Sequence, residues 1–199
     1  MSIRDRNFLA YIGGRIVATA GFCIMPFITL FYTSEAGGKL DKATVMGCFA
    51  AMQVVMSIGY PFLGWLGDHK GHRAGVMTGV AMQSVALIVM IFSAGKASCL
   101  LTYSIVGVVF AAGFISNMNM LFETCPHDSR AAHMTLAYFI MGVPVIVFPM
   151  IAGAVAQHFG FRALFTGCFV ISIAAFLWFV FLVKDPRKLK ARQGAPQPP

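Results

Sequence analysis

Six long apolar segments, separated by short polar connectors, constrain the fold of this chain more than any other feature. Each is close to the roughly 20 residues that an α-helix needs to cross a bilayer. The segments are residues 8–32, 44–66, 74–94, 98–121, 132–157 and 162–183. Of all residues, 58% are hydrophobic and 11% are charged, whereas a soluble domain carries about 25% charged residues. We therefore predict an all-α polytopic membrane protein with six transmembrane helices.

The charged residues predict how these helices are oriented. If the connectors alternate between the two sides of the membrane, one side carries ten lysines and arginines and the other four. The ten are Arg4, Arg6, Lys70, Arg73, Arg130, Lys184, Arg187, Lys188, Lys190 and Arg192, and the four are Lys39, Lys42, Lys96 and Arg162. The positive-inside rule then predicts that both termini are cytoplasmic in a plasma or inner membrane. The transmembrane domain should span residues 1–185, followed by a disordered, basic and proline-rich cytoplasmic tail over residues 186–199.

The net charge of +8 does not indicate a nucleic-acid partner. Nucleic-acid sites place basic residues along one face, interleaved with aromatic residues, but here the basic residues lie in connectors and at the ends. The five cysteines are widely spaced and include no C-x-x-C pair, so we expect no disulfide framework, metal site or other cofactor. Membrane lipid is the predicted surrounding partner.

A membrane-embedded enzyme is disfavoured on the same grounds. An intramembrane serine protease needs a serine in a G-x-S-x-G-like turn and a histidine inside the membrane. Such a serine motif is absent, and the five histidines fall in connectors or at segment ends. An intramembrane thiol oxidase would need paired cysteines.

A shift of 89 residues aligns the two halves of the chain. It carries each of the first three apolar segments onto one of the last three. The matched pairs are Gly64 with Gly153, His69 with His158, Gly71 with Gly160, and Arg73 with Arg162. Because three helices is an odd number, the two copies must cross the membrane in opposite directions. This arrangement is a 3+3 inverted repeat, which is found in transporters.

The stretch GWLGDHKGHR over residues 64–73 resembles the G-x-L-x-D-R-x-G-R-R pattern of the major facilitator superfamily. Histidines at positions 69 and 72 depart from that pattern. The resemblance implies a conformational-switch motif made of Gly64, Asp68, Lys70, Gly71 and Arg73. Its glycines should allow close helix approach and a tight turn, and the carboxylate of Asp68 should face the positive end of the next helix.

A second stretch carries the same resemblance. Glu123, Pro126 and Arg130 are similar to the connector before the fifth helix of a six-helix half in this family, and GFRALF over residues 160–165 is similar to the start of the sixth. The chain thus resembles one half of a twelve-helix transporter, the C-terminal half best. This implies alternating-access transport of a small solute by a secondary transporter or exporter, with a second half as partner, either another copy or a separately encoded chain. The alternative is a non-transporting or truncated membrane scaffold.

Four polar residues inside apolar segments are candidates for a substrate cavity: Arg15, Gln53, Asn117 and Tyr138. Each could equally be structural, since polar groups also join transmembrane helices. Arg15 lies roughly 10 Å into the first segment at 1.5 Å per residue, and it could also extend to the interface. We expect the first, fourth and fifth helices to line the cavity and the phenylalanine-rich sixth helix to face lipid. No acidic residue lies in the middle of a segment, so a proton relay is not predicted in this half.

Overall fold

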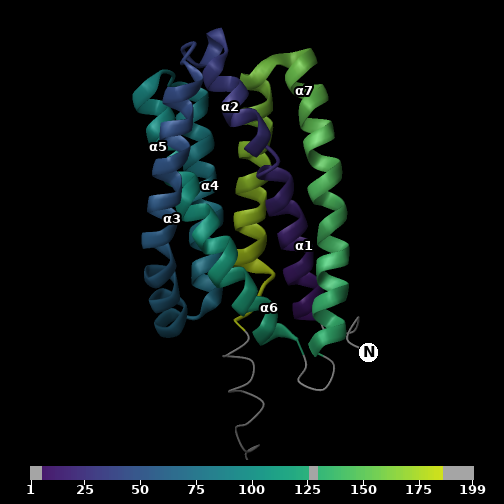
Figure 1. Cartoon of the computed structure of the whole chain (residues 1–199). Coiled ribbons are helices and arrows are strands. Elements are labelled where there is room, and N and C mark those ends of the chain that lie inside the picture. Colours follow the sequence, from purple (N-terminus) through teal and green to yellow (C-terminus); the bar gives the residue numbers. More distant parts are fainter. Residues whose placement is uncertain (1–5, 126–129, 186–199) are drawn as a thin grey trace, which may run out of the picture.

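The computed structural model describes residues 6–125 and 130–185, and in this part of the chain all regular elements are helices. They run side by side along one axis (Figure 1). In chain order they are α1 (Arg6–Gly21), α2 (Met25–Thr33), the 3₁₀ helix η2 (Glu35–Gly37), α3 (Lys42–Lys70), α4 (His72–Phe92), α5 (Lys96–Ala112), the π-helix η3 (Gly113–Asn117), α6 (Met118–Thr124) and α7 (Arg130–Phe181). The all-α architecture predicted from the apolar segments is confirmed. The predicted tail over residues 186–199 lies outside the described residues.

Five stretches of the described chain are long and apolar enough to cross a membrane. They are α1 with α2, α3, α4, α5 with η3 and α6, and α7. The last of these has 52 residues and is broken at Gly160, where φ is 81° and ψ is 169°. Figure 1 shows α7 running along the bundle, turning, and running back, with α1 between its two arms in this view. The fifth and sixth predicted segments are these two arms, and the count of six crossings stays a prediction.

Two glycines that the 89-residue shift aligns have the same backbone conformation. Gly71, between α3 and α4, has φ of 86°, and Gly160, between the arms of α7, has φ of 81°. Residues with a Cβ rarely adopt a backbone conformation with such a positive φ. A glycine is therefore suited to both turns, as expected if the two positions are equivalent in an internal repeat.

The two ends of the membrane domain lie together. The Asn7 side chain donates a hydrogen bond to the carbonyl of Lys184 (3.2 Å) and accepts one from the Lys184 main-chain N–H (2.8 Å). At the opposite end, the main-chain N–H of Gly95 donates to the carbonyl of Gly37 (2.9 Å), joining the α4–α5 turn to η2. The start of α1 and the end of α7 therefore share one end of the bundle.

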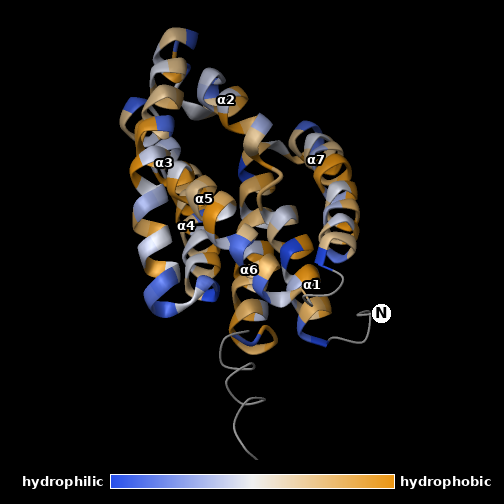
Figure 2. Cartoon of the chain, turned by 60° about the horizontal axis from the view of Figure 1, so that its bottom comes forward, coloured by the Kyte–Doolittle hydropathy of each residue, from blue (hydrophilic) through white to orange (hydrophobic). Residues whose placement is uncertain are grey.

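The start of α3 follows from its sequence. Asp41 precedes the helix and accepts a hydrogen bond from the main-chain N–H of Thr44 (3.0 Å), which satisfies a donor that the helix leaves unpaired. The hydrogen bonds from Thr44 lower the pKa of Asp41 below its usual value. Figure 2 shows hydrophilic residues concentrated near the helix ends and hydrophobic ones along their lengths, as a bilayer requires.

The interior is apolar, and its polar groups are largely paired. Tyr32 is fully buried and hydrogen-bonds to Ser98 (2.9 Å) and Thr102 (2.8 Å). The second arm of α7, predicted to face lipid, has a buried side as well. Phe179 is fully buried and packs edge-on against Tyr11, whereas Phe181 is 75% exposed. The prediction was therefore wrong for this inner face, because aromatic residues suit protein and lipid contacts equally.

Candidate functional site

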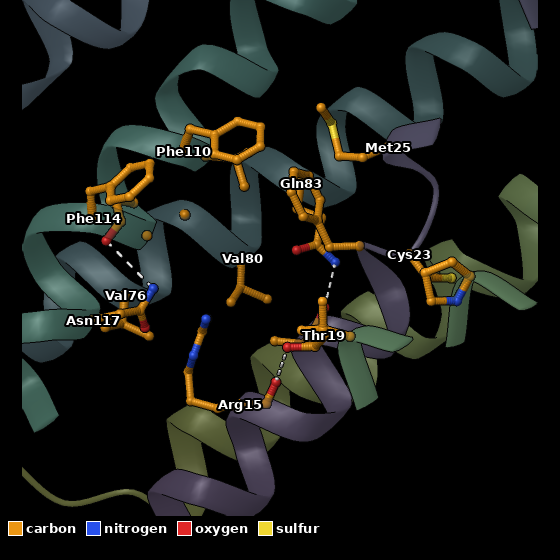
Figure 3. Close-up of a pocket in the computed structure, with 18 of the residues that line it drawn as sticks. Arg15, Thr19, Cys23, Met25, Val76, Val80, Gln83, Phe110, Phe114 and Asn117 are labelled. Carbon is orange, nitrogen blue, oxygen red and sulfur yellow. Dashed lines mark hydrogen bonds between the residues drawn. The ribbon is translucent and has the colours of Figure 1, made fainter. Parts of the chain in front are cut away.

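A cavity of about 490 Å³ lies between α1–α2, α4, α5–η3 and the first arm of α7 (Figure 3). Its size is within the range of small-molecule sites. Most of its lining is apolar, and three of its residues are aromatic: Phe22, Phe110 and Phe114. Its larger polar side chains are Arg15, Thr19, Gln83 and Asn117. A largely apolar pocket with a few convergent polar groups is the usual form of a small-molecule site.

A break in the first predicted helix forms one wall. A turn at residues 22–24 interrupts the helix between α1 and α2, and Pro26 lies in the first turn of α2. Proline is suited to a first turn because its missing N–H would be unpaired there anyway. The first predicted helix is therefore broken beside Pro26. Phe22, Cys23, Met25 and Pro26 all line the cavity.

Another wall contains the π-helix η3. Its residues Gly113, Phe114 and Asn117 line the cavity. A π-helix adds one residue to a turn and is common at functional sites. The side-chain oxygen of Asn117 is buried and has no hydrogen-bond partner among the described residues. The amide nitrogen of Asn117 makes one long contact, 3.5 Å, to the carbonyl of Ala112.

Arg15 is the charged residue of the cavity lining in the described part of the chain. Its half-buried side chain leaves α1 and points into the cavity, between Asn117 and Val80 (Figure 3). The hydroxyl of Thr19 donates to the main-chain carbonyl of Arg15 (2.8 Å). The guanidinium itself makes no ion pair within residues 6–125 and 130–185.

The structure places the other two cavity candidates elsewhere. Gln53 is exposed on α3 and lies outside the cavity lining. Tyr138 is 46% exposed on α7 and donates a hydrogen bond to the sulfur of Met118. Of the four candidates, the structure therefore brings together only Arg15 and Asn117. The first, fourth and fifth predicted helices contribute to the lining, as expected. The third predicted helix, which is α4, lines the cavity as well.

Gln83 of α4 is a cavity residue that the sequence reasoning missed. It is 4% exposed, and its amide nitrogen donates to the Ser172 hydroxyl (2.6 Å) and to the carbonyl of Ala18 (3.2 Å). The signal was present in the internal repeat. The shift of 89 residues aligns Gln83 with Ser172, so two equivalent positions meet where the two copies pack together.

The predicted switch motif lies at the end of the bundle where α3 passes into α4. Asp68 and Lys70 are exposed in the last turn of α3. Asp185 lies beside Gly71, within 2.9 Å of the position that a Cβ would occupy. A Cβ at Gly64 would have nothing within 4 Å among the described atoms, so Gly64 brings no other described helix closer.

Arg73 connects α4 to the end of α7. One guanidinium nitrogen donates to the carbonyls of Phe179 (2.9 Å) and Val180 (2.8 Å). These carbonyls belong to the last turn of the helix, where a cation is favoured by the helix dipole. A motif residue from the first repeat thus caps the last helix of the second.

The predicted connector is described in part. Glu123, in α6, lies 4.0 Å from Nε2 of the buried His72. Arg130 is the first residue of α7, and Pro126 lies outside the described residues. Within the described ranges, no group of three or more histidine, cysteine, aspartate or glutamate side chains could hold a metal ion.

Comparison with known families decides what this helical bundle is. The profile described as Major Facilitator Superfamily matches residues 10–199. This chain belongs to the major facilitator superfamily. It is a membrane-spanning member of a transporter family, which agrees with the resemblance found in residues 64–73.

Relatives of this major facilitator chain include proteins named "Multidrug resistance protein MdtG". The protein from Klebsiella pneumoniae (strain 342) is 27% identical over 182 residues, which are 89% of this chain and 43% of that protein. The protein from Proteus mirabilis (strain HI4320) is 25% identical over 192 residues, which are 90% of this chain and 46% of that protein. The chain therefore spans less than half the length of the curated relatives it matches.

A solved structure shows the same fold. It is a mutant of the peptide transporter POT, crystallised in complex with sulfate. The match has a TM-score of 0.67 at 17% sequence identity and covers 94% of this chain and 42% of that chain. At this identity the likeness concerns the fold alone, and again it covers less than half of the other protein.

Proposed function

We propose that this chain is a half-transporter that moves a small solute across the plasma or inner membrane by alternating access, as a secondary transporter or exporter. The observation that carries the proposal is the cavity of about 490 Å³, walled by a broken helix on one side and a π-helix on another. Interrupted helices around a central site are typical of transporters. The names of the relatives support export of small molecules.

A transport assay on the reconstituted chain tests this function. Proteoliposomes would be loaded with small amphipathic solutes that are anionic, neutral or cationic, and efflux would be followed over time. Val145→Trp should abolish efflux by filling the cavity that Val145 lines. Val147→Trp is the matched control, since Val147 is exposed on the same helix and outside the lining. Equal effects of the two variants would count against the proposal, as would the absence of efflux both by the unmodified chain alone and by that chain with a separately encoded second half.

The functional unit should contain a second six-helix half. An apolar 18-residue stretch of α3 is only 17% buried, compared with 50% for the corresponding stretch of α4. Its exposed side carries polar and small residues such as Gln53, Ser57 and Gly47. Polar groups facing hydrocarbon favour association, and small residues allow close contact. Another copy of this chain or a separately encoded half would fit this face.

The alternative of a non-transporting membrane component has one observation in its favour, which is the coverage of less than half of each relative. In that case the chain would insert and fold but move no solute. An enzyme remains disfavoured, because the family is one of transporters.

A further inference from the structure

We propose that the cavity takes a small organic anion with an aromatic or otherwise apolar body, and that Arg15 selects its negative charge. The inference names the substrate class of the proposed transporter and rests on that function for its biological meaning. It concerns binding, however, and binding can be measured whether or not the chain transports.

The charge distribution around the cavity supplies the first argument. Arg15 contributes a positive charge to the lining, and no aspartate or glutamate of the described ranges is in that lining. The described acidic residues lie at helix ends or in turns: Glu35, Asp41, Asp68, Glu123 and Asp185. A guanidinium in low-dielectric surroundings without a counter-ion is unfavourable. A bound anion would neutralise it, whereas a cation would add repulsion.

The geometry of Arg15 supplies the second argument. Its side chain points into the cavity from α1 (Figure 3), and the hydrogen bond at this residue is made by its main-chain carbonyl. In the described part of the chain the guanidinium donors are not committed to other protein groups. A planar guanidinium can bind a carboxylate or phosphonate through two parallel hydrogen bonds. Asn117 lines the cavity beside Arg15 in Figure 3, and its amide nitrogen, which makes one long contact to Ala112, has a second proton to donate to a ligand.

Gln83, another polar residue of the cavity lining, offers a ligand a hydrogen-bond acceptor and no donor. Gln83 makes two hydrogen bonds through its amide nitrogen, to Ser172 and Ala18. An amide nitrogen carries two protons, so only the carbonyl oxygen of Gln83 remains for a ligand, as an acceptor. The negative charge of the ligand should therefore lie at Arg15 and not at Gln83.

The remaining lining favours an apolar body. The Phe22 and Phe110 rings meet edge to face with centroids 5.5 Å apart, and the Phe110 and Phe114 rings are stacked with centroids 6.4 Å apart. Together they form an aromatic wall from the α1–α2 break to η3. Ring systems pack well against such walls in offset or edge-on geometry.

A matched pair of probes tests the charge preference directly. Radiolabelled 2-naphthoate and 2-naphthamide share one ring system and differ in charge. Equilibrium binding of both would be measured on the chain in lipid nanodiscs. We expect 2-naphthoate to bind about tenfold more tightly than 2-naphthamide or better, as hydrogen bonds to a charged group predict. Equal affinities, or no saturable binding of 2-naphthoate, would overturn the proposal without any variant.

Variants then assign the preference to Arg15. Arg15→Gln should weaken 2-naphthoate binding about tenfold to a hundredfold and leave 2-naphthamide binding unchanged. Arg15→Lys should restore most of the affinity because it restores the charge. Arg162→Gln, at an exposed arginine outside the cavity, is the control and should change neither. An unchanged preference in Arg15→Gln would refute the role of Arg15.

The two proposals fail in different ways. Charge-selective binding without efflux would leave this inference standing and remove the transport function. Efflux of neutral or cationic solutes that is unaffected by Arg15→Gln would support transport and exclude Arg15 as the selecting residue.

Discussion

Arg73 joins two segments that are 106 residues apart in the sequence. From the pattern in residues 64–73 it was expected to belong to a cytoplasmic switch, and the structure adds a specific contact. Its hydrogen bonds to Phe179 and Val180 hold the end of α7 against the start of α4. At the scale of the residue, the motif in residues 64–73 therefore contains Arg73, which caps α7, and the exposed charged residues Asp68 and Lys70.

Loss of this cap should destabilise the fold. Arg73→Gln removes the charged donor of the hydrogen bonds to the two carbonyls. It should lower the free energy of unfolding by about 2 kcal/mol, the typical value for hydrogen bonds to charged groups. For a protein of this size that corresponds to a fall in Tm of about 4–8 °C, measurable by thermal unfolding in detergent. Lys70→Gln makes the same charge change at an exposed residue and should shift Tm little. A similar Tm for both variants would contradict this structural role.

Asp68 should behave in the opposite way. It is exposed at the end of α3, and the interaction of its carboxylate with the start of α4 that the motif predicts would be worth only about 0.3–1 kcal/mol. That energy is too small to decide folding but sufficient to bias two conformations of similar stability. Asp68→Asn should leave Tm close to that of the unmodified chain and alter the rate of efflux from proteoliposomes. A variant that fails to fold would disprove this assignment.

At the scale of the element, α4 is the central helix of the bundle. Half of an apolar 18-residue stretch of α4 is buried, and the helix packs against α5, η3 and the sequence-distant α7. It approaches α5 and η3 closely because it has glycines at the points of contact. A Cβ at Gly79 would lie 2.7 Å from the Cβ of Ala112, and one at Gly75 would collide with the Ser116 side chain. Such close packing is a common way to join helices in a membrane.

A pair of glycine substitutions tests this packing. Gly75→Ala should lower the free energy of unfolding by about 1–3 kcal/mol, since overpacking forces the helices apart. Gly167→Ala, at an exposed helical glycine of α7 with nothing within 4 Å of the added methyl, should be neutral or gain up to about 1 kcal/mol from helix propensity. Thermal unfolding of both variants distinguishes them. If Gly75→Ala is as stable as Gly167→Ala, the close approach of α4 to η3 is not required.

At the scale of the whole molecule, the two ends of the domain lie on one side of the bundle, as the bonds between Asn7 and Lys184 require. The predicted orientation goes further and places that side in the cytoplasm on the ten-to-four distribution of lysine and arginine.

Labelling of introduced cysteines checks this orientation. In a background without the five native cysteines, Lys70→Cys should be protected from a membrane-impermeant maleimide in intact cells, and Lys39→Cys should react. Both positions are exposed in the fold, so exposure alone does not produce the difference. Reaction of both from the same side would show that the topology is wrong.

The size of the complex provides the test of association. If the exposed face of α3 meets a second half, the solubilised particle should have a protein mass of at least about twice the 21.5 kDa of one chain. Light scattering corrected for bound detergent measures this mass. Gln53→Leu on the exposed face should weaken the complex, whereas a monomer that transports solute in liposomes would refute the requirement for a partner.

Sequence alone determined the properties that depend on local composition. The apolar segments correspond to the helices, because the membrane selects for length and hydropathy within each segment. The motif in residues 64–73 and the connector to Arg130 identified the family, because these stretches are contiguous in the chain. The turn at Gly71 follows from the backbone freedom of a single glycine.

The tertiary structure decided which side of each helix faces the cavity, the core or lipid. Gln53 and Gln83 are the same residue type in neighbouring apolar segments, yet only Gln83 lines the cavity. Likewise, Phe179 lies in the core, whereas Phe181, two residues later, is exposed. In a soluble protein polarity would separate these cases, but lipid is as apolar as a protein core, so hydropathy carries little information about helix rotation. That rotation is set by contacts between distant segments, such as those of Gln83 with Ser172 and of Gly75 with Ser116.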